Sequence, residues 1–121
     1  MYENRDSFSL PLNTQTTIGG TGATTMVAAP GAGKSIVLDM FRIQFRTDTT
    51  ADIECFFRGD TTGSGRFRTL TNLTSTAMPI FVQLEQPWIL PSNSVLQFVL
   101  SVTAASTPAA DIEVTYRILT Q

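Results

Sequence analysis

The chain has 121 residues and a net charge of −2, and 42% of its residues are hydrophobic whereas only 15% are charged. A chain of this length forms one domain, and its composition argues against a coiled coil, a disordered protein and a basic nucleic-acid binder. Histidine is absent and Cys55 is the only cysteine, which excludes an intrachain disulfide, a His-based catalytic triad and a zinc cluster. We expect Cys55 to be a small buried hydrophobic residue.

The first 22 residues predict an N-terminal arm or edge segment, and residues 23–121 predict the main β-domain. Within the arm, Phe8, Leu10 and Leu12 alternate with serine and proline. This pattern is typical of a short edge strand, because proline cannot donate a hydrogen bond to a central ladder. An arm that becomes ordered only against a partner is the alternative.

The stretch Lys34–Arg58 predicts two long antiparallel strands joined by a tight turn at Thr49. Apolar and polar residues alternate in both halves, and one register places Phe41 opposite Phe57 on the buried face. The phase of the alternation changes inside the first strand, which predicts a β-bulge near Met40 and Phe41. The same register predicts the pairs Phe45/Ile53, Ile43/Cys55 and Arg46/Asp52.

The strand after the next glycine-rich loop is expected to extend this hairpin into a three-stranded meander, with Phe67 opposite Phe57. On the outward face of the meander, Arg42 and Arg68 would flank the ring of Phe56. Such cation and ring contacts add about 0.5–1 kcal/mol each at exposed positions. We therefore interpret this group as a surface feature and a candidate contact area.

Further alternating segments predict more strands, with turn signals between them and no convincing 3.6-residue period. In the segment that begins at Ile80, Phe81 falls on the outward phase, and Trp88 is expected to close one end of the core. About eight strands result, which predicts an all-β fold, either an antiparallel sandwich or a closed barrel. The segments outside the meander are 8–12, 24–29, 80–85, 95–103 and 111–119.

One motif suggests chemistry. Residues 28–35, Ala-Ala-Pro-Gly-Ala-Gly-Lys-Ser, resemble a phosphate-binding loop with alanine in place of the first glycine. In such a loop Lys34 would reach the terminal phosphates and Ser35 would hold Mg²⁺. That loop also requires a helix that begins at the lysine, whereas the residues after Ser35 continue as a β-branched strand. The sequence therefore favours a tight turn followed by a strand over nucleotide binding.

Two pairs of carboxylates occur two residues apart, Asp52 with Glu54 and Asp111 with Glu113. Paired carboxylates are what general acid and base catalysis would use. Each pair falls on the outward phase of its strand, where solvated charges are the simpler interpretation.

Several aromatic residues are expected on surfaces that a monomer should keep polar: Phe56, Phe81, Tyr2 and Phe8. Exposed aromatic side chains are typical of contact with a protein partner. Burial of one or two of them beneath loops is the alternative.

Three parts of the chain together resemble small β-sandwich proteins of tailed bacteriophages, of the capsid decoration, cement or head-fibre kind. These parts are Ala29–Lys34 with the strand after it, Pro87–Pro91 with Val95–Leu100, and Glu113–Arg117. The likeness covers about residues 23–121. It implies a jelly-roll-like sandwich that assembles as a homotrimer and clamps subunits of the major capsid protein at the virion surface, after synthesis in the host cytoplasm. An N-terminal arm would then contact the shell or a neighbouring protomer.

The resemblance thus implies a non-enzymatic virion structural protein, a cement subunit acting as a homo-oligomer. We expect no cofactor, metal, nucleic acid, membrane or small-molecule substrate. A carbohydrate-binding module of a phage tail fibre or receptor-binding protein is the main alternative, with Trp88 as an aromatic contact. A nucleotide-hydrolysing enzyme comes third. The candidate partner-binding residues are Tyr2, Arg5, Phe8, Arg42, Phe56 and Arg68.

Overall fold

The computed structural model describes residues 7–18, 22–45, 53–59, 66–73, 80–102 and 110–121. These residues form nine strands and include no helix long and apolar enough to cross a membrane. The strands are β1 (Ser7–Phe8), β2 (Leu12–Ile18), β3 (Gly22–Val27), β4 (Lys34–Phe45), β5 (Ile53–Arg58), β6 (Arg66–Leu73), β7 (Ile80–Ile89), β8 (Leu96–Val102) and β9 (Ala110–Thr120).

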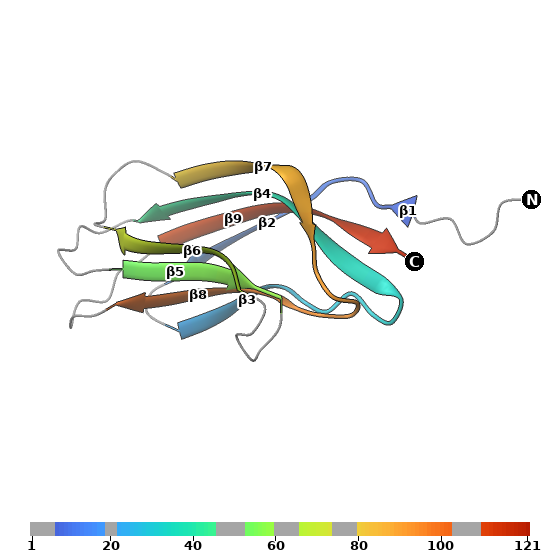
Figure 1. Cartoon of the computed structure of the whole chain (residues 1–121), viewed down its shortest axis with the longest axis horizontal. Coiled ribbons are helices and arrows are strands. Elements are labelled where there is room, and N and C mark those ends of the chain that lie inside the picture. Colours follow the sequence, from blue (N-terminus) through green and yellow to red (C-terminus); the bar gives the residue numbers. More distant parts are fainter. Residues whose placement is uncertain (1–6, 19–21, 46–52, 60–65, 74–79, 103–109) are drawn as a thin grey trace, which may run out of the picture.

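The strands form two antiparallel sheets that face each other (Figure 1). The five-stranded sheet has the order β1-β9-β4-β7, and β2 continues along β9 beyond β1. The four-stranded sheet has the order β3-β8-β5-β6. The predicted all-β, jelly-roll-like sandwich is therefore confirmed. The division of the chain at residue 22 stays a prediction, although residues 12–18 pair along the length of β9.

The predicted hairpin between the two central strands is wrong. β4 pairs with β9 and β7, whereas β5 pairs with β8 and β6 in the other sheet. Phe41 and Phe57 do meet, with ring centroids 4.7 Å apart, but they meet across the two layers. An alternating sequence fixes which face of a strand is buried, and two strands that face one core from opposite sheets satisfy the same pattern.

The expected meander is wrong for the same reason, because β4 is not in the sheet of β5 and β6. Its second half is confirmed, since β5 pairs with β6 and Phe57 lies opposite Phe67. The ladder shifts register between Cys55 and Phe57. The predicted pair of Arg46 and Asp52 lies outside the described residues.

The predicted bulge in β4 is present. The register shifts between Leu38 and Met40 in the pairings with both neighbours, and Asp39 is the extra residue opposite β9. The shift moves the buried phase by one position, so that Ile36, Leu38, Phe41 and Ile43 all lie in the core. One strand therefore buries both halves of its apolar sequence on a single face.

The centre of the core is aromatic. Phe57 contacts Phe41 at 4.7 Å and Phe98 at 5.2 Å between ring centroids, in tilted and edge-on geometries. Such geometries suit the quadrupoles of the rings. Cys55 is fully buried beside them, as expected. The inward residues of β8 and β9 complete the core, namely Leu96, Phe98, Leu100, Ile112 and Val114.

Replacing Phe57 by alanine should lower the free energy of unfolding by about 3–5 kcal/mol, because it opens a cavity between the two sheets. Denaturant unfolding followed by intrinsic fluorescence measures the change. The matched control is Phe81→Ala on β7, where the ring is 54% exposed and where the loss should be about 0.5 kcal/mol. Equal losses for the two variants would contradict the placement of Phe57 at the centre.

Candidate functional site

A group of polar side chains lies on the outside of the five-stranded sheet. On β9, Asp111, Glu113 and Thr115 alternate with the buried Ile112 and Val114, so the three polar side chains point away from the core. The neighbouring strand β2 places a polar residue opposite each of them: Asn13 opposite Thr115, Gln15 opposite Glu113, and Thr17 opposite Asp111. We call these six residues, together with Arg42 and Gln44 of β4, the polar face.

Each of these cross-strand pairs is hydrogen-bonded. Asn13 donates its side-chain amide to Thr115 Oγ1 at 3.2 Å, and Thr17 donates its hydroxyl to Asp111 Oδ1 at 2.7 Å. Gln15 donates Nε2 to a carboxylate oxygen of Glu113. These bonds fix the side chains as well as the strand register, because directly opposed pairs are the unit of sheet stabilisation.

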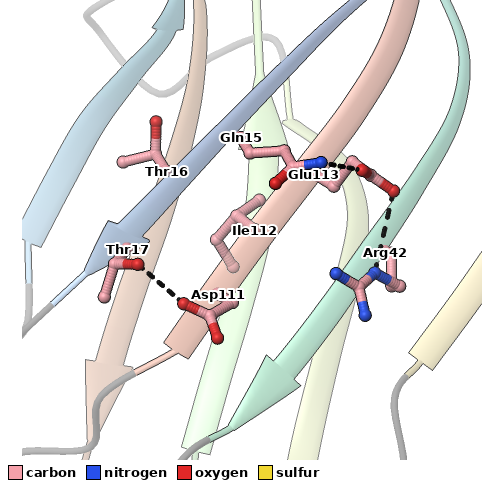
Figure 2. Close-up of a pocket in the computed structure, with 7 residues that line it drawn as sticks. All are labelled: Gln15, Thr16, Thr17, Arg42, Asp111, Ile112 and Glu113. Atoms are coloured by element: carbon pink, nitrogen blue, oxygen red, sulfur yellow. Dashed lines mark hydrogen bonds and ion pairs between the residues drawn. The ribbon is translucent and has the colours of Figure 1, made fainter.

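Arg42 extends the polar face onto β4. Its Nε lies 3.7 Å from Glu113 Oε1, and its Nη1 donates to Gln44 Oε1 at 3.3 Å. Figure 2 shows Gln15, Glu113 and Arg42 linked across three strands, with Thr17 bonded to Asp111 below them. The side chains surround an open hollow of about 340 Å³. It offers carboxylate acceptors and guanidinium and amide donors within one small area.

A second cluster of side chains holds β1 against β9. Arg117 on β9 donates from Nε and Nη2 to the two carboxylate oxygens of Asp39, both at 2.8 Å, a bidentate geometry that is stronger than a single ion contact. The guanidinium also lies 4.7 Å from the centre of the Phe8 ring. Ser9 closes the attachment, because its amide donates to the Ile118 carbonyl and its Oγ accepts from the Ile118 amide, both at 2.8 Å.

The charge of Arg117 is permanent in this cluster. Its hydrogen bonds to Asp39 raise the pKa of the guanidinium above its ordinary value, while partial burial acts in the opposite direction. A raised pKa means that this stabilisation is complete below the ordinary pKa of arginine and is lost only in strongly alkaline solution.

Exposed apolar side chains mark the two edges of the same sheet. Among the residues whose side chains the structure describes, the large hydrophobic residues that are exposed belong to the β1–β2 segment or to β7: Phe8, Leu10, Leu12, Phe81 and Ile89. Leu10, between β1 and β2, is 83% exposed. We call Phe8, Leu10 and Leu12 the N-terminal apolar edge. Edge strands with exposed apolar residues are ready to pair with another chain.

The structure separates the residues that the sequence predicted as one contact area. Arg42 lies on the outside of the five-stranded sheet, whereas Phe56 and Arg68 belong to the other sheet. Phe56 is only 5% exposed and pairs with Val99 of β8, so the expectation of an exposed ring is corrected. The backbone of Arg68 is part of β6, and its side chain lies outside what the structure describes.

For the predicted arm, Phe8 is half-exposed beside Arg117. Tyr2 and Arg5 lie outside the described residues. Whether any of the six predicted residues binds a partner stays a prediction.

The loop that resembles a phosphate-binding motif ends in a turn, in which the Lys34 amide donates to the Gly31 carbonyl at 3.1 Å. Strand β4 begins at Lys34, as the sequence predicted. No group of three side chains suited to hold a metal ion occurs among the described residues. Trp88 is partly buried and packs against the core, which weakens its case as a platform for sugars.

Sequence reasoning missed the roles of Asp39, Arg117 and Gln15. Asp39 stands at the point where the alternation of β4 changes phase, so the bulge could have drawn attention to it. Arg117 is on the outward phase of a correctly predicted strand, but its partner depends on β4 lying beside β9. Gln15 was in a threonine-rich stretch that was not recognised as a strand.

No protein-family profile matches the chain, and no curated protein sequence matches it. Among solved structures, a chain in the acidic stable capsid of Helicobacter pylori bacteriophage KHP30 has a TM-score of 0.66 and 14% identity, over 93% of this chain and 91% of that chain. A chain of the cyanophage Pam1 capsid has a TM-score of 0.49 and 14% identity, over 97% of this chain and 89% of that chain. The first likeness shows that the fold is shared along nearly the whole of both chains.

Replacing Arg117 by methionine should loosen β1, because it removes both the bidentate ion pair and the contact with the Phe8 ring. We expect a loss of about 1 kcal/mol in the free energy of unfolding and faster hydrogen exchange at the Ser9 amide. NMR-detected exchange measures this amide directly. In the control variant Arg42→Met, which does not contact β1, Ser9 exchange should stay at the wild-type rate. Unchanged exchange in Arg117→Met would mean that the backbone alone holds β1.

Proposed function

We propose that the chain is a non-enzymatic structural protein of a virion, a capsid decoration or cement subunit that works as a homo-oligomer at the capsid surface. A trimer is the expected form, and the major capsid protein is the expected partner. The observation that carries this proposal is the fold shared with a chain of the phage KHP30 capsid structure over 93% of this chain and 91% of that chain. The match therefore pairs two domains of similar length.

The placement of exposed apolar residues supports a role in assembly. A monomer rarely exposes several large apolar residues close together in its sequence, yet Phe8, Leu10 and Leu12 are all exposed within one short segment at the edge of the sheet. This edge is held in place by Arg117 and Ser9, so little ordering entropy is lost when a partner covers it. We assign it as the contact with a second copy or with the shell.

A subunit that stabilises a capsid shell through such a surface does not need to catalyse a reaction. An interface of ordinary size buries about 800 Å² on each partner, and a subunit that spans two neighbours resists their separation through that burial. The polar face gives no support for catalysis, because Glu113 and Asp111 are both engaged by neighbouring side chains.

Purified protein should be oligomeric by multi-angle light scattering, and it should bind to capsid shells that were assembled without it and raise their melting temperature. Leu10→Asp should stay folded, because the side chain is 83% exposed, and should weaken shell binding about 10-fold or more through loss of a buried leucine and the introduction of a charge.

The control is Ile89→Asp, a change at a half-exposed position on the opposite edge, which should bind shells as the wild type does. A monomeric protein that does not bind shells or change their stability would refute the proposed function. Loss of binding only in Ile89→Asp would refute the assignment of the N-terminal apolar edge.

A further inference from the structure

One row of outward side chains crosses the whole five-stranded sheet. Gln15 of β2 is opposite Glu113 of β9, Glu113 is opposite Arg42 of β4, and Arg42 is opposite Phe81 of β7. Neighbouring strands lie about 4.8 Å apart, so the row extends over roughly 14 Å. Its length matches that of a short oligosaccharide.

The polar part of the row has the groups that recognise hydroxyls. A sugar hydroxyl both donates and accepts, so it needs acceptors and donors side by side. Glu113 accepts, Arg42 presents a fork of donors, and Gln15 supplies both kinds of group. Thr17 and Asp111 add a hydroxyl and a carboxylate in the next row, around the same hollow (Figure 2).

These side chains are positioned before any ligand arrives. Arg42 and Glu113 are 34% and 26% exposed, and the bonds from Gln15 to Glu113 and from Arg42 to Gln44 limit their rotamers. All of them stand on strands, which hold a site more accurately than loops do. The hollow of about 340 Å³ is open and polar, unlike the enclosed apolar pockets that hold most small ligands.

Phe81 gives the row its apolar end. Its ring is 54% exposed, whereas Ile80 and Val82 on either side of it pack against the core. Arg42 and Phe81 are directly opposed in the register, so their Cβ atoms are about 5 Å apart. An exposed ring next to hydroxyl-binding groups can cover the C–H face of a pyranose while its hydroxyls meet the polar side chains.

The charges select the kind of sugar. Glu113 and Asp111 bring two negative charges to the hollow and Arg42 brings one positive charge. The described side chains that line the hollow therefore carry more negative than positive charge, which disfavours sulfated or carboxylated sugars. Neutral hexopyranoses and N-acetylhexosamines fit this balance.

We infer that the row Gln15, Glu113, Arg42 and Phe81 is a binding subsite for neutral oligosaccharides. This inference goes beyond the proposed function and does not depend on it, because the row shares no residue with the N-terminal apolar edge. It differs from the sugar site expected at Trp88, since it lies on the outside of the sheet. A structural protein with this subsite would add weak affinity for a glycan surface to its role in the shell.

The test titrates the full chain with maltotetraose, chitotetraose and a heparin-derived tetrasaccharide, and follows amide and side-chain signals by NMR. We expect saturable shifts with a neutral probe, centred on the residues of β2, β9 and β4 that line the hollow and on Phe81, the register neighbour of Arg42 on β7. We expect no saturable shifts with the heparin probe. Phe81→Ala and Arg42→Ala should each raise the dissociation constant for the neutral probe at least about 10-fold. Thermal unfolding of each variant confirms that it is folded.

Ile89→Ala is the matched control, because it removes a similarly exposed apolar side chain from the same strand, and it should bind the neutral probe as the wild type does. Leu10→Asp should also retain sugar binding, which separates this inference from the proposed function. Absence of saturable shifts with both neutral probes would overturn the inference. The inference would also be overturned if Phe81→Ala abolished shell binding or self-association while no saccharide gave saturable shifts. The face would then be a protein interface.

Discussion

A single extra residue in β4 allows both halves of this strand to face the same core. The bulge at Asp39 allows Ile36 and Leu38 before it, and Phe41 and Ile43 after it, to point into one core. Without the shift, the second half of the strand would bury Arg42 and expose Phe41, which would bury an unpaired charge at a large cost in free energy. The aromatic centre of the core, where Phe41 meets Phe57, therefore depends on this irregularity.

The same bulge contributes to both surface features. Asp39 reaches Arg117 and so helps to hold the Phe8 ring and strand β1 at the edge of the sheet. Beyond the bulge, Arg42 points outward and joins Glu113 and Gln15 in the polar face. The proposed assembly contact and the proposed sugar subsite thus lie on one sheet but use different forces. The first depends on apolar burial at an edge, and the second depends on positioned polar groups and one ring.

The sequence predicted which side of each strand is buried better than it predicted which strands pair with one another. Cys55, Phe57, Phe98 and Val114 lie in the core as their alternation indicated, and the bulge was expected within two residues of its position. The hairpin failed because a chain that crosses between sheets leaves no local signal of the crossing. The prediction that the Phe56 ring is exposed was wrong. Its position in the alternation points away from the core, and yet the ring is almost completely covered in the folded protein.

Local chemistry along the chain was enough to establish the all-β class, the buried phase of most strands and the turn that ends at Lys34. These properties follow from side-chain alternation and from proline and glycine, which act over a few residues. The pairings of β4 with β9 and of β5 with β8 were decided only by the tertiary structure, because they join residues far apart in the chain. Both candidate surfaces consist of such long-range neighbours. Gln15, Arg42, Phe81 and Glu113 become one row only after four distant strands have formed a sheet.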